Sequence, residues 1–305
     1  MKTKTIAALL GATLASPMVT ANSTNKLTEL SSFPIDFERG DGLATGDVDG
    51  NGRDEIIHGD RGDRIRVYST NGVYSTDGKI LWEFRVKFLE HDGLAVGDVN
   101  GDGRDEIIHG SREDKIDTYV ANGNRLDSFG LDFERGDGLT TGDVNGDGKD
   151  EIIHGDRGDI ITIYDSSGRQ LRLPMRIDFK EYDGLAAGGG GHWIFHADRK
   201  DLINVFDIHG KIHLSRKFSF RRGEGFVLGK VLGGSNTYIV HGDTHDDWLD
   251  VHVASNGDLF DRFQLDFLEW DGLAVGDIDG DGQDEIIHAD RHDRITIYKI
   301  VPSTN

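Results

Sequence analysis

One stretch of this 305-residue sequence organises the rest: Gly46-Asp-Val-Asp-Gly-Asn-Gly-Arg-Asp-Glu-Ile-Ile-His58. It returns with small changes at residues 97–109, 142–154 and 276–288. Each copy places oxygen-bearing side chains at loop positions 1, 3, 5 and 9, and a glycine at position 6 permits a sharp turn. A hard cation with six to eight oxygen ligands requires such a loop, and calcium is the usual one. The pattern predicts about four structural Ca²⁺ ions.

The same stretch marks the period of an internal repeat. An acidic residue followed by glycine precedes each motif, and it recurs every 41 to 51 residues, which defines six units, two of them without the loop. In the first unit, alternating apolar residues predict strands at 43–46, 55–58, 64–68 and 84–88. Four short strands in about 45 residues match one blade of a β-propeller. The recurring acids are Asp41, Asp92, Asp137, Asp183, Glu224 and Asp271.

The two ends of the chain fit a closed ring. The last unit stops after its third strand, at residues 294–298, while an unpaired strand is expected at residues 33–37. If that segment completes the last blade, no sheet edge remains open. The sequence thus predicts an all-β fold, a single six-bladed β-propeller over residues 22–305, with four-stranded blades and closure by N-terminal strand exchange.

Residues 1–21 have the features of a secretory signal peptide: a basic start, a short apolar run and small residues before the expected cleavage site. A glycosylation sequon, Asn22-Ser-Thr24, follows it, and there are no cysteines to form disulfides. We therefore expect a secreted protein without membrane insertion. The net charge of −21 argues against nucleic acid as a partner, and the sequence leaves the oligomeric state open.

The motif Asp-Val-Asn-Gly-Asp-Gly-Xaa-Asp-Glu-Ile-Ile-His-Gly resembles the FG-GAP/VCBS repeats of the integrin α-chain propeller family, over about residues 33–298. The resemblance implies calcium ligands at loop positions 1, 3, 5, 7 (through the carbonyl) and 9. This sequence has Glu at position 9 and an extra Asp, such as Asp54, at position 8, so which of the two binds stays open. The implied sets are Asp47, Asp49, Asn51, Arg53 and Glu55; Asp98, Asn100, Asp102, Arg104 and Glu106; Asp143, Asn145, Asp147, Lys149 and Glu151; and Asp277, Asp279, Asp281, Gln283 and Glu285.

A histidine recurs at the end of the second strand in all six units, including the two without a loop. We interpret these residues either as a ligand-binding ring with the acids Asp41, Asp92, Asp137, Asp183 and Asp271, or as structural groups bonded to an acid of the neighbouring blade. The six are His58, His109, His154, His196, His241 and His288.

The position just before each acid alternates between glycine and an aromatic residue. Odd units have Gly40, Gly136 and Gly223, whereas even units have His91, Tyr182 and Trp270. One residue earlier, arginine and glutamate alternate in the same way. Because strand geometry places these residues opposite the loops, they predict an asymmetric central pocket there. The charged members are Arg39, Glu90, Arg135, Glu181, Arg222 and Glu269.

These groups favour an enzyme that acts on a small molecule or sugar by proton transfer and oxyanion stabilisation. No covalent nucleophile motif or redox motif is present. Propellers that this one resembles include lyases, dehydratases and natural-product cyclases such as hetero-Diels–Alder catalysts. The alternatives are a glycan-binding lectin or adhesion module and a purely structural surface protein.

Overall fold

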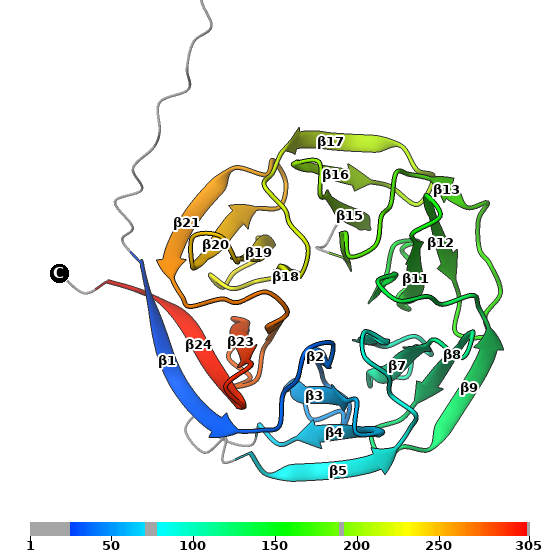
Figure 1. Ribbon diagram of the computed structural model, residues 1–305, viewed down its shortest axis with the longest axis horizontal. Coiled ribbons are helices and arrows are strands. Elements are labelled where there is room, and N and C mark those ends of the chain that lie inside the picture. Colours follow the sequence, from blue (N-terminus) through cyan, green and yellow to red (C-terminus); the bar gives the residue numbers. More distant parts are fainter. Residues whose placement is uncertain (1–24, 71–77, 189–191, 304–305) are drawn as a thin grey trace, which may run out of the picture.

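The computed structural model describes residues 25–70, 78–188 and 192–303, and this part of the chain contains strands and turns but no helix. Six four-stranded antiparallel sheets surround a central axis (Figure 1). The predicted six-bladed β-propeller is confirmed. With no helix among the described residues, none there is long and apolar enough to cross a membrane. The expected signal peptide and Asn22 lie outside the described residues.

Each of the first five blades runs through four consecutive strands from the axis outward. Blade one contains β2 (Gly42–Gly46), β3 (Glu55–Asp60), β4 (Arg64–Tyr68) and β5 (Ile80–Arg85); blade two β6 (Gly93–Gly97), β7 (Glu106–Ser111), β8 (Lys115–Tyr119) and β9 (Arg125–Gly130); blade three β10 (Gly138–Gly142), β11 (Glu151–Asp156), β12 (Ile160–Tyr164) and β13 (Met175–Arg176). Blade four contains β14 (Gly184–Gly188), β15 (Trp193–Asp198), β16 (Leu202–Phe206) and β17 (Ile212–Lys217); blade five β18 (Gly225–Gly229), β19 (Tyr238–Asp243), β20 (Trp248–Val253) and β21 (Leu259–Gln264).

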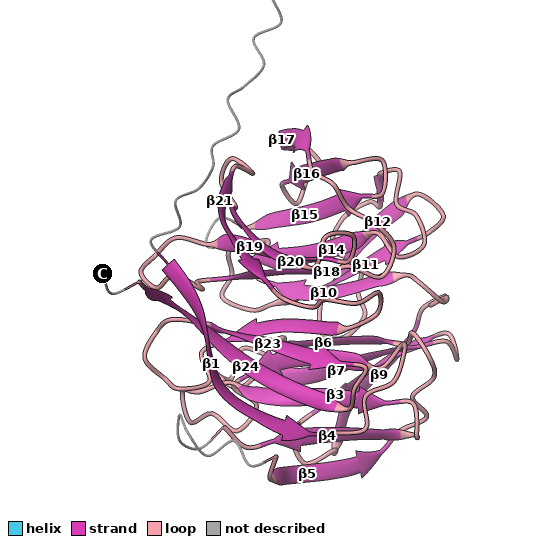
Figure 2. Ribbon diagram, turned by 60° about the vertical axis from the view of Figure 1, so that its left-hand side comes forward, coloured by secondary structure: helices cyan, strands magenta, loops and turns pink. Residues whose placement is uncertain are grey.

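Blade six combines the two ends of the described chain. Its strands are β22 (Gly272–Gly276), β23 (Glu285–Asp290), β24 (Arg294–Pro302) and β1 (Asn25–Pro34). β1 runs antiparallel to β24, with Asn25 opposite Pro302 and Pro34 opposite Arg294 (Figure 2).

Two outer strands lie earlier in the chain than predicted: the N-terminal strand covers Asn25–Pro34 rather than 33–37, and the fourth strand of blade one covers Ile80–Arg85 rather than 84–88. The strand predicted at 294–298 extends to Pro302. After both β1 and β5 the chain turns inward so that a phenylalanine, Phe37 or Phe88, is buried between blades. Interior packing therefore overrides the alternating pattern at these ends.

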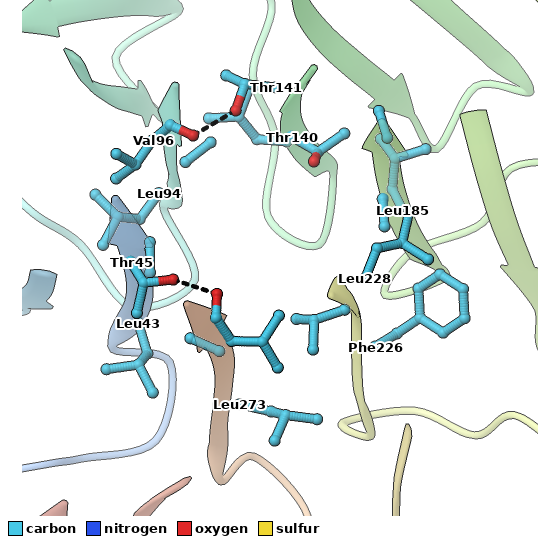
Figure 3. Close-up of a pocket in the computed structure, with 18 residues that line it drawn as sticks. Leu43, Thr45, Leu94, Val96, Thr140, Thr141, Leu185, Phe226, Leu228 and Leu273 are labelled. Atoms are coloured by element: carbon cyan, nitrogen blue, oxygen red, sulfur yellow. Dashed lines mark hydrogen bonds between the residues drawn. The ribbon is translucent and has the colours of Figure 1, made fainter. Parts of the chain in front are cut away.

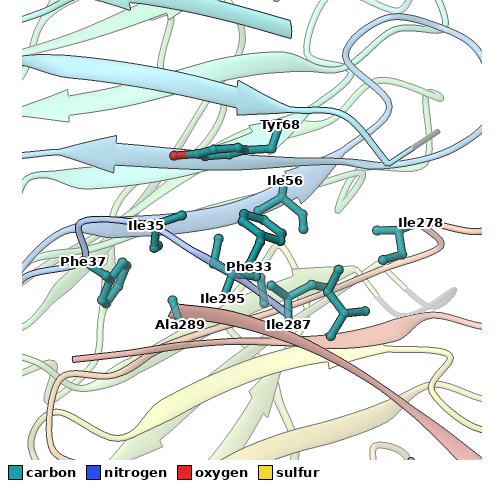
Figure 4. Packing of buried hydrophobic residues seen from close by; sticks show 11 residues of the cluster. Phe33, Ile35, Phe37, Ile56, Tyr68, Ile278, Ile287, Ala289 and Ile295 are labelled. Carbon is teal, nitrogen blue, oxygen red and sulfur yellow. The ribbon is translucent and has the colours of Figure 1, made fainter. Parts of the chain in front are cut away.

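The core lies between adjacent blades. Ile56 and Ile57 of β3 are both fully buried, because a blade is covered by neighbours on its two faces. Phe33 of β1 packs in one cluster with Ile295 of blade six and with Ile56 and Tyr68 of blade one (Figure 4). The first strand thus contributes to the contact between the last blade and the first.

Candidate functional site

The loops between the first and second strands of blades one, two, three and six gather carboxylates; we call these the loop-bearing blades. In blade one, ligand oxygens of Asp47, Asp49 and Glu55 lie within 4.8 Å of one another, as do those of Asp277, Asp279 and Glu285 in blade six. Two glycines of the blade-one loop have positive φ, and the Asp47 carboxylate accepts hydrogen bonds from the backbone N–H of Asn51 and Gly52 at 2.9 and 2.8 Å. The loop is thus shaped by its own backbone around the carboxylates.

The acidic residues at loop positions 8 and 9 have different surroundings. The position-8 Asp105 accepts a hydrogen bond from the backbone N–H of Asp47, in the preceding blade, at 2.8 Å. Its own N–H donates to the Asp47 carbonyl at 3.0 Å. The equivalent Asp54 accepts from the Asp277 N–H at 2.9 Å. Position 8 therefore links neighbouring loops, whereas position 9, as in Glu55, faces its own loop.

The position-9 glutamates are buried without enough compensating donors. Burial, with neighbouring carboxylates, raises the pKa of Glu55 to about 8 and the pKa of Glu106, Glu151 and Glu285 to about 7. Glu55 Oε2 has no hydrogen-bond partner in the described part of the chain. A divalent cation would offset both the repulsion and the missing bond, so this donor set fits calcium.

The side chains at loop position 7 reach away from their own loop. Arg104 packs against Gly50 of the preceding blade's loop, Lys149 against Gly101, and Arg53 against Gly280. Gln283 instead donates hydrogen bonds to the carbonyls of Val231 and Ile300. Only the carbonyls of these residues are implied as calcium ligands.

The six recurrent histidines each bond the recurrent acid of their own blade. His58 Nε2 lies 3.0 Å from Asp41 Oδ2, and the same pair recurs at 2.9 to 3.0 Å in the other five blades. The predicted bond to a neighbouring blade is therefore wrong. The start of the first strand and the end of the second are neighbours in one antiparallel pair, so these residues meet within a blade.

Each acid also closes two turns. Asp41 accepts hydrogen bonds from the backbone N–H of Glu38 and of Arg61. The six histidine residues are buried, between 0 and 3% exposed. These contacts favour a structural role for the His–acid pairs over direct contact with a ligand.

A phenylalanine that was not predicted from the sequence packs against each His–acid pair. Phe88 packs on Gly59 of blade one and stacks on His109 of blade two, with ring centroids 4.9 Å apart. It thus fills the space between two blades, which explains the glycine that follows the histidine. The signal was available, because a phenylalanine stands four residues before the acid in every unit: Phe37, Phe88, Phe133, Phe179, Phe220 and Phe267.

The structure brings His91, Tyr182 and Trp270 together on the axis; we call them the aromatic trio. The ring centroids of His91 and Trp270 are 4.5 Å apart, those of Tyr182 and Trp270 4.6 Å, and those of His91 and Tyr182 5.1 Å. All three residues have positive φ, between 62 and 75°. Backbone of this kind is rare for bulky residues and clusters at functional sites.

The alternation with glycine has a steric cause. Each trio residue donates its backbone N–H to the carbonyl of the glycine in the preceding blade: His91 to Gly40, Tyr182 to Gly136 and Trp270 to Gly223, at 2.7 to 2.9 Å. A Cβ on Gly40 would lie 2.6 Å from the Glu90 side chain and 2.8 Å from the His91 nitrogen. Odd blades need glycine so that the trio and its glutamates can lie over them.

Arginine and glutamate side chains surround the trio. The Arg39 guanidinium lies 4.9 Å from the Trp270 ring centroid, and that of Arg222 lies 4.7 Å from the Tyr182 centroid. Arg39 and Arg135 both approach Glu90, at 3.5 and 3.3 Å. Glu181 and Glu269 lie beside Gly136 and Gly223 in the other two blade pairs. The predicted charged residues are therefore grouped around one central feature.

Polar atoms of the trio are buried beside charged side chains. His91 Nε2 makes no hydrogen bond among the described residues, but Glu90 Oε1 lies 3.4 Å from it. The Tyr182 hydroxyl lies near Arg135 and Glu181. Burial, with the Arg135 charge, lowers the pKa of His91 to about 4, while burial raises the pKa of Tyr182. At neutral pH the site therefore offers an uncharged imidazole, a protonated phenol and a nearby guanidinium.

Two cavities lie along the axis. One, of about 260 Å³, is lined by the trio, by four of the recurrent aspartates and by Phe226. The other, of about 330 Å³, is lined by the first strands and adjoins it at Phe226. Leucine side chains such as Leu43, Leu94 and Leu273 surround this second space (Figure 3). Its threonines Thr45 and Thr141 donate hydrogen bonds to the carbonyls of Val275 and Val96. Polar atoms nevertheless supply more of the exposed lining than apolar atoms do.

Comparisons with known proteins identify the fold class. No family model matches the sequence, and no curated protein matches it. Two similar solved structures are crystal structures of BBS1N in complex with ARL6DN, soaked with lead and with mercury. They have TM-scores of 0.57 and 0.56 at 10% and 9% identity, and each match covers 92% of this chain and 98% of the other.

The fold and these neighbours together define a six-bladed β-propeller. At this level of identity the likeness concerns the architecture alone. Any function must therefore be argued from the residues of the axial site.

Proposed function

We propose that this protein is a secreted, calcium-stabilised β-propeller that binds one small molecule on its axis and transforms it by acid–base and electrostatic catalysis. The observation that carries the proposal is the aromatic trio: three bulky residues on positive-φ backbone, in mutual contact, with polar atoms buried next to arginine and glutamate side chains. A merely structural plug would not need the unusual backbone.

The chemistry of the cavities favours a compact molecule that presents both polar and apolar surface, with an oxygen function at the trio end. Leucines line the first-strand cavity, while His91, Tyr182 and Arg135 provide polar groups next to the trio cavity. The two adjoining spaces together fall within the roughly 300–1,000 Å³ typical of small-molecule sites.

A neutral imidazole accepts a proton, and a protonated phenol donates a hydrogen bond to oxygen. Arg135, close to both, stabilises negative charge that develops there. Proton abstraction with stabilisation of an oxyanion or enolate suits a lyase, dehydratase or cyclase. No step of this kind requires a covalent nucleophile.

The geometry favours this reading over a glycan-binding lectin. Sugar sites on propellers commonly repeat on several blades, and here the repeated groups, the His–acid pairs, are buried. The faces of Tyr182 and Trp270 are also covered, by one another and by arginines. A single, non-repeated site fits one small ligand better than an extended glycan.

Calcium is proposed to neutralise the loop carboxylates, with the position-9 glutamates rather than the position-8 aspartates as ligands. Asp47, Asp49 and Glu55 exemplify the donor set. The metal would hold the loop between first and second strands, remote from the aromatic trio in the repeat. Its proposed role is stability rather than chemistry.

The experiment is a set of variants assayed with a panel of small metabolites. Tyr182→Phe removes only the hydroxyl, and His91→Gly restores the residue type of the odd blades. Each is expected to reduce turnover by on the order of 10²–10⁴, with calcium content and melting close to those of the unmodified protein. Lys217→Ser, at an exposed lysine of the outer strand β17, is the control and should keep full activity. Full activity in folded Tyr182→Phe and His91→Gly proteins would remove the trio as the site.

A further inference from the structure

The loop of blade six differs from the other three loops because a lysine enters it. Lys299 Nζ lies 2.7 Å from Asp279 Oδ2, 2.8 Å from Asp281 Oδ2 and 2.6 Å from Glu285 Oε1. These carboxylates occupy loop positions 3, 5 and 9, where calcium ligands are expected. One ammonium group therefore contacts three of the side chains that would surround the metal.

The contacts are largely shielded from water. The side chain of Lys299 is 11% exposed, that of Asp279 7% and that of Glu285 0%. The ammonium donates hydrogen bonds to Asp279 and Asp281, and the Glu285 carboxylate lies next to it as an ion pair. Charge-assisted bonds of this kind are stronger than neutral ones, and a partly buried pair is less screened by salt.

No other loop-bearing blade has a cation at this place. Tyr298, just before Lys299, pairs with Ile286 of the second strand, and the matching pairs elsewhere are Tyr68 with Ile56, Tyr119 with Ile107 and Tyr164 with Ile152. The residues equivalent to Lys299 are Ser69, Val120 and Asp165. None of these three supplies positive charge.

The first loop shows what remains when the lysine is missing. Among the described residues, Asp47, Asp49 and Glu55 form no ion pair with lysine or arginine. In blade six two of the matching carboxylates, those of Asp279 and Glu285, form ion pairs with Lys299. The two loops share the motif but not the charge balance.

We propose that Lys299 is the built-in cation of the blade-six loop, so that the chain binds three calcium ions rather than four. This rests on the proposal that the other loops bind calcium. A calcium ion in blade six would have to displace an ammonium that contacts three carboxylates, or share them with it against charge repulsion. Blade six contains both β1 and β24. With Lys299 in place of calcium, the pairing of these two strands would not depend on the metal supply.

The test counts bound calcium in the full secreted protein after metal removal, reloading and desalting, by elemental analysis and calorimetry. We expect three ions in the unmodified protein and four in Lys299→Ser, which introduces the residue found in blade one. Lys217→Ser, at an exposed lysine of β17, is the matched control and should bind three. Lys299→Met keeps the aliphatic stem and replaces the serine variant if that variant does not fold.

The outcomes separate the two proposals. Four ions in the unmodified protein would overturn the role of Lys299 while leaving the calcium loops intact. Three ions in both proteins would also overturn it, because removing the lysine would not have opened a site. An unmodified protein that binds no calcium would overturn the calcium proposal itself, and the Lys299 proposal with it.

Discussion

The four loop-bearing blades and blades four and five, which lack the acidic loop motif, differ in the side chains that they place at the start of the second strand. At the first residue of the second strand, the former have a buried glutamate, whereas the latter have Trp193 and Tyr238. The Trp193 ring lies 4.4 Å from that of His213, and the Tyr238 ring 5.5 Å from that of Phe260. Aromatic packing thus takes the place of a carboxylate cluster that we propose binds calcium.

What the two kinds of blade share is equally informative. His196 in blade four and His241 in blade five bond their own acids as the other histidines do. Phe179 stacks on His196 with ring centroids 5.1 Å apart, and Phe220 lies tilted against His241 at 5.7 Å. The contacts on the trio side are therefore common to the whole ring, and the difference is confined to the loop side.

The largest effect on folding is expected from removal of β1, the strand that completes blade six. A chain that begins after Phe37 should aggregate even in excess calcium, because β24 would be left as an unpaired edge. Gel filtration and circular dichroism of the truncated protein provide the measurement. A soluble, folded monomer would contradict the view that β1 is required in this blade.

Calcium removal should come next in size. Chelation leaves the buried carboxylates of the loop-bearing blades to repel one another, so we expect the melting temperature to fall by more than about ten degrees. Scanning calorimetry with and without chelator measures this, and readdition of calcium should restore the transition. An unchanged transition after verified metal removal would rule out a stabilising metal.

A matched pair of substitutions sharpens the comparison between blades. Glu106→Gln in blade two should reduce the stabilisation gained from calcium, because one charged ligand is lost. Trp193→Ala in blade four should lower stability by about 2–4 kcal/mol through lost packing, equally with and without calcium. Urea unfolding of both variants at two calcium concentrations distinguishes them. If both respond to calcium alike, the proposed difference between the blades is wrong.

The pH dependence of the calcium-free protein follows from the raised glutamate pKa values. A carboxyl with a folded pKa of about 7–8 and an unfolded pKa near 4.5 retains its proton longer in the folded state. Metal-free stability should thus fall as pH rises from 6.5 to 8.5. Below pH 6.5 the lowered pKa values of His91 and His252, about 4, act in the opposite direction.

Calcium should flatten the decline between pH 6.5 and 8.5, because the bound ion holds the same carboxylates ionised. Urea titrations at the two pH values, with and without metal, provide the check. A metal-free protein that becomes more stable over this interval would contradict the assignment of the buried glutamates.

The smallest stability change is expected at the aromatic trio. In His91→Gly, relief of the positive-φ strain opposes the loss of ring packing, so the unfolding free energy should change by no more than about 1 kcal/mol. Gly40→Ala is the converse control, since its Cβ would meet Glu90 and His91, and it should be clearly destabilising. Equal effects of the two variants would contradict the steric account of the alternation.

The sequence was sufficient for the architecture because its information is periodic. The repeated acid, loop and histidine gave the number of blades, and the contrast between glycine and aromatic residues marked the trio. The ends of the outer strands could not be predicted, because burial of Phe37 and Phe88 between blades ends the strands early. The partner of each histidine was assigned to the wrong blade for a similar reason: spacing alone does not say which strands pair.

The sequence placed the aromatic trio in one central site, but it could not predict that the three rings contact one another. His91, Tyr182 and Trp270 are distant in the chain and meet only because three even blades converge on the axis. Lys299 carries no motif either, and its role depends on the pairing of β24 with β23. Both features arise from three-dimensional packing rather than from local pattern.

The most direct test of the central claim is a crystal structure of the calcium-replete protein soaked with a panel of metabolites and glycans. The account predicts a single bound molecule per chain in the axial cavities, in contact with Tyr182 and Phe226 and within reach of His91. Ligand density repeated at several blade junctions, with none on the axis, would contradict it.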